Sequence, residues 1–164
     1  MNEKKEITVV YDVLSKTDLD FSVGSNPTIF HCMYEENPWP GMSEQFVRVP
    51  GDALPYQTSF TVNGSAPVTG LSQKIDTSNY YGRIRFVAVL DTNSGTVKAW
   101  RKIDDSIASS GVVSLSNFVS VTQNLILGAY QTSSGTKGRF WKGTIYDFKV
   151  YNFAFTDNEA TAYL

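Results

Sequence analysis

The sequence predicts an all-β fold: an antiparallel β-sandwich of the jelly-roll type, closed by a short C-terminal helical turn. Of the 164 residues, 61 are Val, Ile, Thr, Tyr, Phe or Trp, which suit pleated strands, and 33 are Ala, Leu, Glu or Lys, which favour helices. Short runs of alternating apolar and polar residues recur between turn residues. The length predicts one domain over residues 1–164, large enough to bury a core without disulfides.

The first half of the chain reads as short strands interrupted by loops. Alternation and apolar runs predict five strands, at 7–13, 19–23, 28–34, near 46–49 and at 57–62. All six prolines lie between Pro27 and Pro67. Because proline cannot donate to a sheet ladder, this region favours loops and edge strands. The segment 35–45, EENPWPGMSEQ, is therefore predicted to be a loop.

The second half contains the strongest local signal, a β-hairpin at 83–103. Two alternating runs flank the turn Asp91-Thr92-Asn93-Ser94-Gly95, which is typical of a hairpin. Further strands are predicted at 112–116, 124–131 and 139–151.

The last of these strands changes its apolar parity. A β-bulge near Tyr146 and Asp147 would accommodate that change. It is predicted to keep five side chains on the core side: Trp141, Gly143, Ile145, Phe148 and Val150.

A short helix is predicted to close the chain. Thr156-Asp157-Asn158-Glu159 fits a capping box, in which the Thr156 hydroxyl and the Glu159 carboxylate each satisfy a free backbone N–H of the first turn. The helical turn should end at Tyr163 and Leu164.

Composition excludes several function classes. The single histidine, His31, cannot build a multi-histidine zinc site, and the single cysteine, Cys32, permits neither an intrachain disulfide nor a thiolate cluster. The net charge of −2 lacks the basic footprint of a nucleic-acid binder. No apolar run is long enough for a membrane span. The charged start, MNEKKE, lacks the apolar region of a signal peptide.

The candidate catalytic side chains in the sequence are better explained by structural roles. Asp18 and Asp20 share one strand face, but alternation with apolar neighbours explains them as a solvated outer face. His31 and Cys32 are sequence neighbours in an apolar run and should face opposite sides of a strand. They are interpreted as a structural histidine and a buried cysteine rather than as a catalytic pair. No catalytic residue is therefore assigned.

The last third of the chain resembles the concanavalin A-like lectin/glucanase superfamily, especially its laminin-G-like members. The matching residues are Leu127-Gly128, Trp141-x-Gly143-x-Ile145, Val150-Tyr151-Asn152 and Thr156-x-x-Glu159, with the upstream hairpin FVAVLDTNSGTVKAWRK at 86–102. The resemblance covers roughly residues 83–164 and implies a single concanavalin A-like sandwich over 1–164. The Glu-x-Asp-x-x-Glu string of the superfamily's glucanases is missing, which disfavours a polysaccharide-degrading glucanase or lyase.

Calcium is the cofactor that this resemblance suggests, with Asp91 and Asn93 as candidate ligands. Asp104-Asp105 offers further oxygens. The same D-x-N-x-G string is also good turn chemistry, so both interpretations stay open. Two departures weaken the calcium inference: the acid after the strand isoleucine is displaced from Tyr146 to Asp147, and Ile103-Asp104-Asp105 replaces the usual Asp-Gly turn.

Carbohydrate binding is the leading functional hypothesis. An exposed aromatic ring can cover the apolar face of a sugar while polar groups bind its hydroxyls. The candidate residues are Trp39 in a proline-bounded loop, Tyr80 and Tyr81 before a glycine, and Trp100 between two lysines on a face predicted to be solvated. Ordinary packing remains the alternative for each. A small basic–aromatic patch, Lys137, Arg139 and Lys142 beside Phe140 and Trp141, is interpreted as a core tryptophan with solvated lysines.

The sequence therefore predicts a non-catalytic recognition module whose partner is a glycan or a glycosylated surface. The alternative is a structural or assembly domain of a virion or cell-surface appendage, in contact with other subunits. Both hypotheses favour an extracellular, cell-surface or virion-associated location.

Overall fold

Two antiparallel sheets pack against each other in the part of the chain that the structure describes. The structure is a computed structural model, and it describes residues 6–15, 28–33, 41–48, 55–62, 74–76, 82–114, 124–132 and 134–164. Its elements in chain order are β1 (Glu6–Ser15), β2 (Thr28–Met33), β3 (Gly41–Arg48), β4 (Pro55–Val62), β5 (Lys74–Asp76), β6 (Arg83–Asp91), β7 (Thr96–Ile103), β8 (Ser106–Ser114), β9 (Ile126–Leu127), β10 (Tyr130–Gln131), β11 (Lys137–Gly138), β12 (Gly143–Tyr151) and α1 (Asp157–Tyr163).

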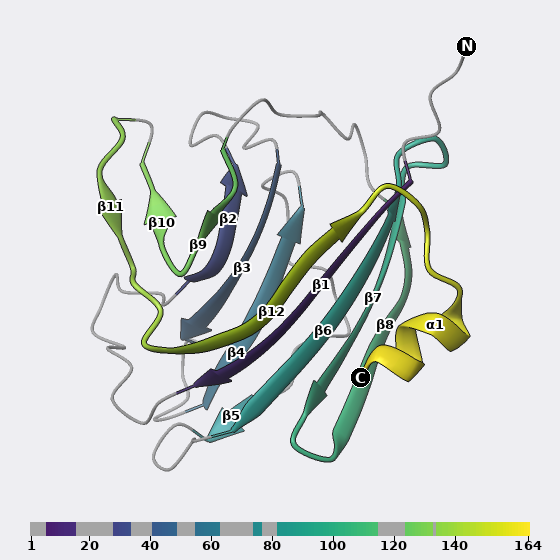
Figure 1. Cartoon of the computed structure of the whole chain (residues 1–164), viewed down its shortest axis with the longest axis horizontal. Coiled ribbons are helices and arrows are strands. Elements are labelled where there is room, and N and C mark those ends of the chain that lie inside the picture. The colour runs from purple at the N-terminus through teal and green to yellow at the C-terminus, as the bar shows by residue number, and fades with distance from the viewer. Residues whose placement is uncertain are drawn as a thin grey trace.

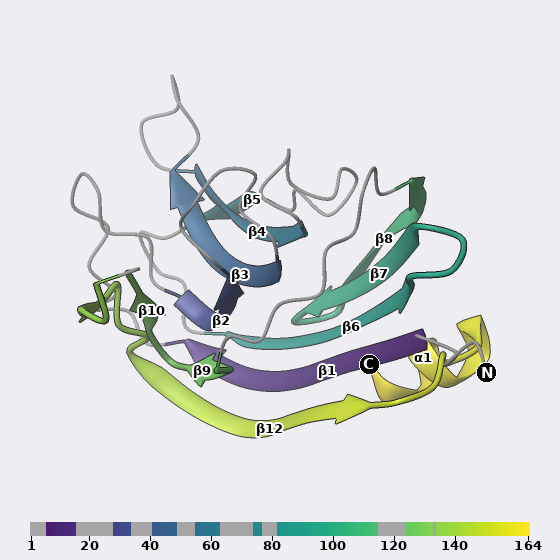
Figure 2. The same cartoon turned by 90° about the horizontal axis from the view of Figure 1, so that it is seen from above.

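The main sheet has the strand order β12-β1-β6-β7-β8, and the second sheet has the order β5-β4-β3-β2-β9. Figure 1 shows the main sheet face-on, and Figure 2 shows the second sheet lying within its concave side. A two-stranded ribbon, β10-β11, extends at one end. This arrangement confirms the predicted antiparallel β-sandwich with a short C-terminal helix.

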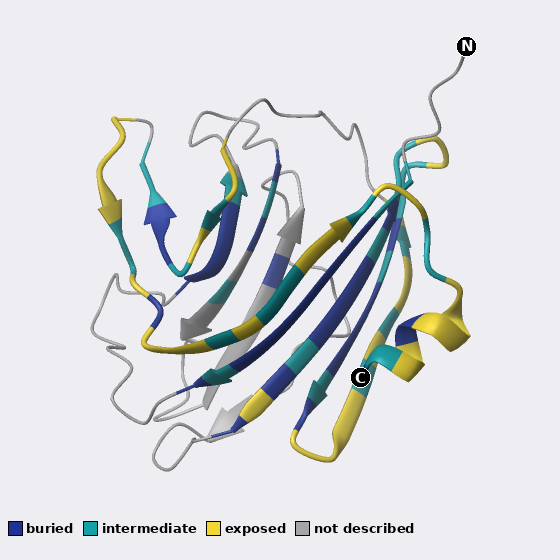
Figure 3. Cartoon of the chain, in the orientation of Figure 1, coloured by how far each residue is buried: buried dark blue, intermediate teal, exposed yellow. Residues whose placement is uncertain are grey.

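The hydrophobic core lies between the two sheets. Alternate residues of β1, β6 and β7 supply most of it, and Figure 3 shows the buried stripes along these strands. Aromatic rings join the layers: Phe86 stacks on Tyr11 with centroids 4.9 Å apart, and Phe60 of the second sheet meets Phe86 edge-on at 5.1 Å. Trp141 is buried against the same cluster, as its position in the strand motif predicted.

A second, smaller apolar cluster lies on the opposite face of the main sheet, beneath α1. It consists of Val10, Val87, Trp100, Ala160 and Leu164. The predicted capping box at the start of α1 is confirmed, because the backbone N–H of Glu159 donates to Thr156 Oγ1 and the Glu159 carboxylate accepts from the backbone N–H of Thr156. An ion pair of 2.5 Å between Lys98 Nζ and Asp157 Oδ2 also joins α1 to β7.

Two local predictions in the second half are confirmed in detail. The hairpin is formed by β6 and β7, with the turn residues 92–95 between them. The bulge occurs at Tyr146, since Asp12 pairs with Asp147 whereas Val13 pairs with Ile145. The extra residue puts both Ile145 and Phe148 against the core.

Other element predictions were wrong or incomplete. Residues 41–45 are not loop, because β3 starts at Gly41 and is held by pairing with both β2 and β4. The strand predicted at 112–116 starts earlier, at Ser106, because Asp104 and Asp105 form a two-residue turn. The segment 124–131 divides into β9 and β10 at Gly128, which adopts a φ of 72°.

The strand predicted at 139–151 begins only at Gly143. Val150 is 54% exposed rather than buried, because β12 is the edge strand of the main sheet. The strand predicted at 19–23 and the acids Asp18 and Asp20 lie outside the described residues.

Candidate functional site

Of the four predicted aromatic ligand-binding residues, one lies within the described part of the chain. Trp39, Tyr80 and Tyr81 lie outside the described residues. Trp100 is described, and its predicted place on a solvated face is wrong: it is 5% exposed. Trp100 does lie on the face of β7 that points away from the core, as the alternation predicted, but α1 covers that face. Lys98 Nζ lies 4.9 Å from the centroid of the indole ring. Trp100 is therefore packed between the main sheet and the helix.

The candidate calcium ligands Asp91 and Asn93 belong to the β6–β7 turn. Asp91 Oδ1 accepts hydrogen bonds from the backbone N–H groups of Asn93 (2.8 Å) and Ser94 (3.2 Å), and Oδ2 accepts one from the Ser94 hydroxyl (2.6 Å). The hydrogen bonds from Ser94, and then from Asn93, lower the pKa of Asp91. Turn chemistry thus accounts for both residues, and calcium binding stays a prediction.

The described residues contain neither a cluster of metal-ligating side chains nor a long apolar helix. No group of three or more His, Cys, Asp or Glu side chains that could hold a metal ion occurs among them. Within the same residues, no helix is long and apolar enough to cross a membrane.

His31 and Cys32 lie where the sequence placed them, in an apolar strand. His31 is 3% exposed, and its ring lies 4.3 Å from that of Tyr130. Cys32 is half-buried, and burial raises the pKa of its thiol. A thiol with a raised pKa is a poorer nucleophile at neutral pH, which agrees with the structural interpretation of this pair.

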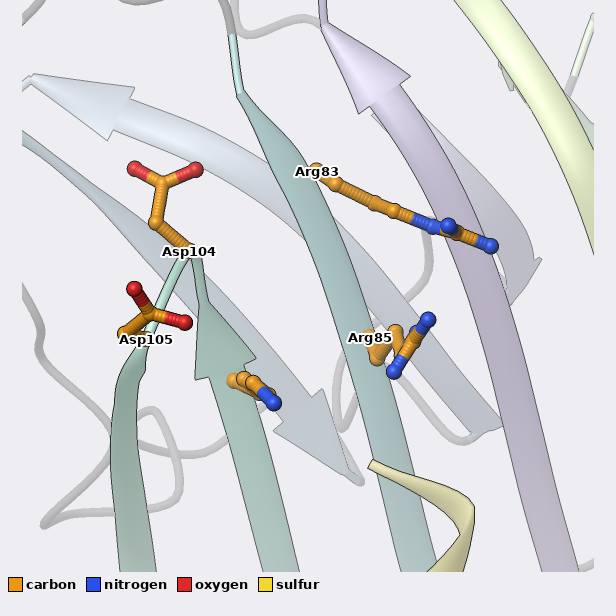
Figure 4. A pocket seen from close by; sticks show the side chains of 5 residues that line it. Arg83, Arg85, Asp104 and Asp105 are labelled. Carbon is orange, nitrogen blue, oxygen red and sulfur yellow. The ribbon is translucent and has the colours of Figure 1, made fainter.

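A polar pocket of about 210 Å³ lies at the end of the β6–β7–β8 region of the main sheet. Its lining residues are Arg83, Arg85, Lys102, Asp104 and Asp105. Figure 4 shows the two carboxylates on the β7–β8 turn and the two guanidinium groups on the side of β1. Cationic donors and anionic acceptors therefore flank one open space.

Strand geometry explains how these residues meet. Arg83 and Arg85 are two residues apart in β6 and so project from the same face. Lys102 pairs with Arg85 across the hairpin and shares that face. The turn brings Asp104 alongside, because its backbone N–H donates to the carbonyl of Arg83 at 3.3 Å. Asp104 has a φ of 51°, a left-handed conformation that aspartate tolerates better than most residues.

The two arginines are held in place by Asp12 of β1. Arg83 donates from Nε to Oδ1 (2.7 Å) and from Nη2 to Oδ2 (2.5 Å) of Asp12. Arg85 Nε lies 3.5 Å from the same carboxylate, and Arg85 Nη1 donates to the Leu164 carbonyl at 2.5 Å. The hydrogen bond with Asp12 raises the pKa of Arg83. Two guanidinium groups are thus fixed around one buried carboxylate.

The remaining three lining side chains are uncommitted. Among the described residues, Lys102, Asp104 and Asp105 have no side-chain hydrogen bond or ion pair. One exposed aromatic ring contacts a lining residue of the pocket: Tyr146, on the bulge of β12, is 56% exposed, and its ring centroid lies 5.2 Å from the Arg83 guanidinium. This combination of donors, acceptors and an exposed ring suits a polyhydroxylated ligand.

Sequence reasoning missed this pocket although its signals were present. Asp104-Asp105 was treated as a departure from a family motif rather than as a tight turn. Arg83 and Arg85 alternate with the apolar residues of β6 and so lie on the face away from the core. However, only the pairing of β6 with both β1 and β7 brings Asp12, Lys102 and the turn together.

The network around Asp12 gives a stability prediction. We expect Asp12→Asn to lower the free energy of unfolding by about 2 kcal/mol, since hydrogen bonds to charged groups contribute roughly 1.5–3 kcal/mol and both guanidinium groups would lose their anion. Urea unfolding followed by fluorescence measures the change. Asp104→Asn is the matched control: its carboxylate is exposed, so we expect a change within about 0.5 kcal/mol. Equal effects for the two variants would contradict the assigned role of Asp12.

Comparisons with known proteins bear on the fold. No protein-family model and no curated protein matches the chain. Among solved structures, the chain is similar to one described as the Ruminococcus gnavus IT-sialidase CBM40 bound to α2,6 sialyllactose. The TM-score is 0.50 at 13% sequence identity, and the alignment covers 97% of this chain and 82% of that one. The two chains thus share a β-sandwich fold, and the concanavalin A-like and laminin-G-like assignments stay predictions.

Proposed function

We propose that this domain binds carbohydrate without altering it, and that the pocket formed by β6, β7 and the β7–β8 turn contacts the sugar. The observation that carries the proposal is the pairing of uncommitted donors and acceptors in one space. Lys102 can donate to sugar hydroxyl oxygens, and Asp104 and Asp105 can accept from sugar hydroxyl groups. A saccharide needs both kinds of partner.

The small volume of the pocket supports contact with a single sugar unit. Ligand clefts that enclose drug-sized molecules are roughly 300–1,000 Å³. A pocket of about 210 Å³ suits a single sugar unit at the end of a glycan. The exposed ring of Tyr146, in contact with the lining residue Arg83, offers apolar surface that can pack against the C–H face of the next unit.

The fold comparison supports the same class of function. The similar solved chain is described as a carbohydrate-binding module in complex with a sialylated trisaccharide. Because one fold hosts many functions, this support is an analogy, and the specific argument comes from the pocket residues.

A glycan array followed by calorimetry tests the proposal. The array should include neutral oligosaccharides and α2,6 sialyllactose, and the best binder is then titrated against variants. We expect Lys102→Met and Asp104→Asn each to weaken binding about tenfold, which corresponds to about 1.4 kcal/mol, at the lower end for a hydrogen bond to a charged group. Both substitutions replace exposed or half-exposed side chains, so folding should be preserved.

Lys137→Met is the control for a general change in charge, because Lys137 lies in β11 and outside the main sheet. The Lys137→Met chain should bind the glycan with the same affinity as the unmodified chain. A chain that binds nothing on the array would refute carbohydrate binding. A glycan bound equally well by all three variants would instead show that another surface binds it.

A further inference from the structure

The β10–β11 ribbon carries an excess of positive charge that the proposed function does not use. Residues 106–146 include no aspartate or glutamate, whereas Lys137, Arg139 and Lys142 all lie within this stretch. The sequence pattern indicated solvated lysines around the core residue Trp141. The three cationic residues differ in exposure: Lys137 and Lys142 are exposed, whereas Arg139 is half-buried.

The backbone of Arg139 is fixed in an unusual conformation. Its φ is 51°, in the left-handed region that side chains other than Gly, Asn and Asp rarely adopt. The Arg139 carbonyl accepts a hydrogen bond of 2.9 Å from the backbone N–H of Thr28, which anchors this position to the start of β2. Strained residues that the surrounding structure holds in place are concentrated at functional sites.

The side chain of Arg139 contacts two neighbouring side chains, Tyr130 and Gln45. The guanidinium lies 4.3 Å from the ring centroid of Tyr130, and that ring in turn contacts the buried ring of His31. Arg139 Nη1 lies 3.5 Å from Gln45 Oε1, and the Gln45 amide donates to the Ser43 hydroxyl at 2.9 Å. Stacking on Tyr130 occupies the face of the guanidinium and leaves its in-plane N–H donors for another partner.

No carboxylate supplies that partner within the residues that the structure describes. The contacts of the Arg139 guanidinium there are Tyr130 and Gln45, both uncharged. This differs from Arg83, which is neutralised by two hydrogen bonds to Asp12. A half-buried, oriented guanidinium without an anion is well suited to bind a planar carboxylate through two parallel N–H···O bonds.

We infer that Arg139, stacked on Tyr130 beside Gln45, binds a carboxylate, and that the ligand class is an acidic sugar. The site lies on the second sheet and the β10–β11 ribbon, separate from the pocket on the main sheet. That the carboxylate belongs to a sugar rests on the proposed function; that Arg139 binds a carboxylate rests on its own geometry.

The test observes Arg139 directly by NMR. The side-chain Nε–Hε cross-peaks are recorded while the chain is titrated with sodium glucuronate, with glucose and with sodium chloride at matched ionic strength. We expect the Arg139 cross-peak to shift in a saturable way with glucuronate and to stay in place with the other two. A cross-peak that does not move, or that moves equally with chloride or glucose, would overturn the inference.

Two variants complete the design. Arg139→Asn removes the guanidinium with a residue that tolerates a positive φ, so the backbone can be kept, and glucuronate affinity should fall about tenfold. Lys137→Met should retain the shift of the Arg139 cross-peak. Unchanged glucuronate affinity in a folded Arg139→Asn chain would overturn the inference. Because oligosaccharide binding at the main-sheet pocket is tested separately with Asp104→Asn, failure of either site is distinguishable from failure of the other.

Discussion

Gly143→Ala should destabilise the chain by about 3 kcal/mol or more, because overpacking against a backbone that cannot move lies at the upper end of such effects. Gly143 begins β12 opposite Ser15. A Cβ built at this position overlaps the carbonyl oxygen of Leu14 and lies 2.8 Å from Trp141 Nε1. The first obstacle is backbone of the neighbouring strand and the second is a buried ring. Relief therefore requires β12 to separate from β1.

Gly138→Ala is the matched control for this substitution. A Cβ on Gly138 has nothing within 4 Å, and its φ is not positive. Urea unfolding should show a loss for Gly143→Ala and little change for Gly138→Ala. Equal stabilities of the two variants would mean that β12 does not approach β1 as closely as described. The expected result also explains the Trp-x-Gly-x-Ile motif physically: the glycine leaves room for the tryptophan.

Trp100→Ala should cost about 3–5 kcal/mol, the usual range for removing a buried aromatic side chain. The indole ring fills the space between the main sheet and α1, where Val87 and Leu164 are among its neighbours in the cluster. Without it, the apolar cluster beneath α1 loses its aromatic ring, and a helix of this length is not stable alone. Loss of the far-ultraviolet helical signal before global unfolding would mark release of α1.

This result separates the two interpretations of Trp100 that the sequence left open. A packing role predicts a large loss of stability, with Trp100→Phe losing less because the ring is partly retained. A platform role predicts full stability and lost glycan affinity. A stable Trp100→Ala chain would thus contradict the buried placement and return Trp100 to the list of ligand-binding candidates.

Local patterns predicted most of the fold because alternation, turn chemistry and capping act over a few residues. The hairpin, the bulge at Tyr146 and the capping box at Thr156 all depend on such short-range signals. The errors arose where distant pairing decided the outcome. Residues 41–45 contain turn formers, but hydrogen bonds with two neighbouring strands make them part of β3. Edge position, which exposes Val150, is likewise a property of the whole sheet.

The candidate site was harder to predict than the fold for the same reason. Trp100 was placed on the correct face of β7, but no local pattern showed that α1 returns to cover that face. In the sequence, Asp12 is a polar residue of an alternating strand. Its contacts with Arg83 and Arg85 exist only because β6 pairs with β1. Arg139 was recognised as basic, whereas no local pattern indicated its left-handed backbone or its hydrogen bond with Thr28.

The pairing of β1 with β12 has a consequence for the order of folding. The Thr8 hydroxyl of β1 donates to the carbonyl of Phe153 at 2.7 Å and accepts from the N–H of Phe155 at 3.0 Å, across about 145 residues of chain. Chains dominated by such distant contacts close large loops before they gain energy, and they fold in milliseconds to seconds. During synthesis, β1 emerges early and has to wait for β12 before one of its two edges is paired, so nascent chains expose that edge to other partners.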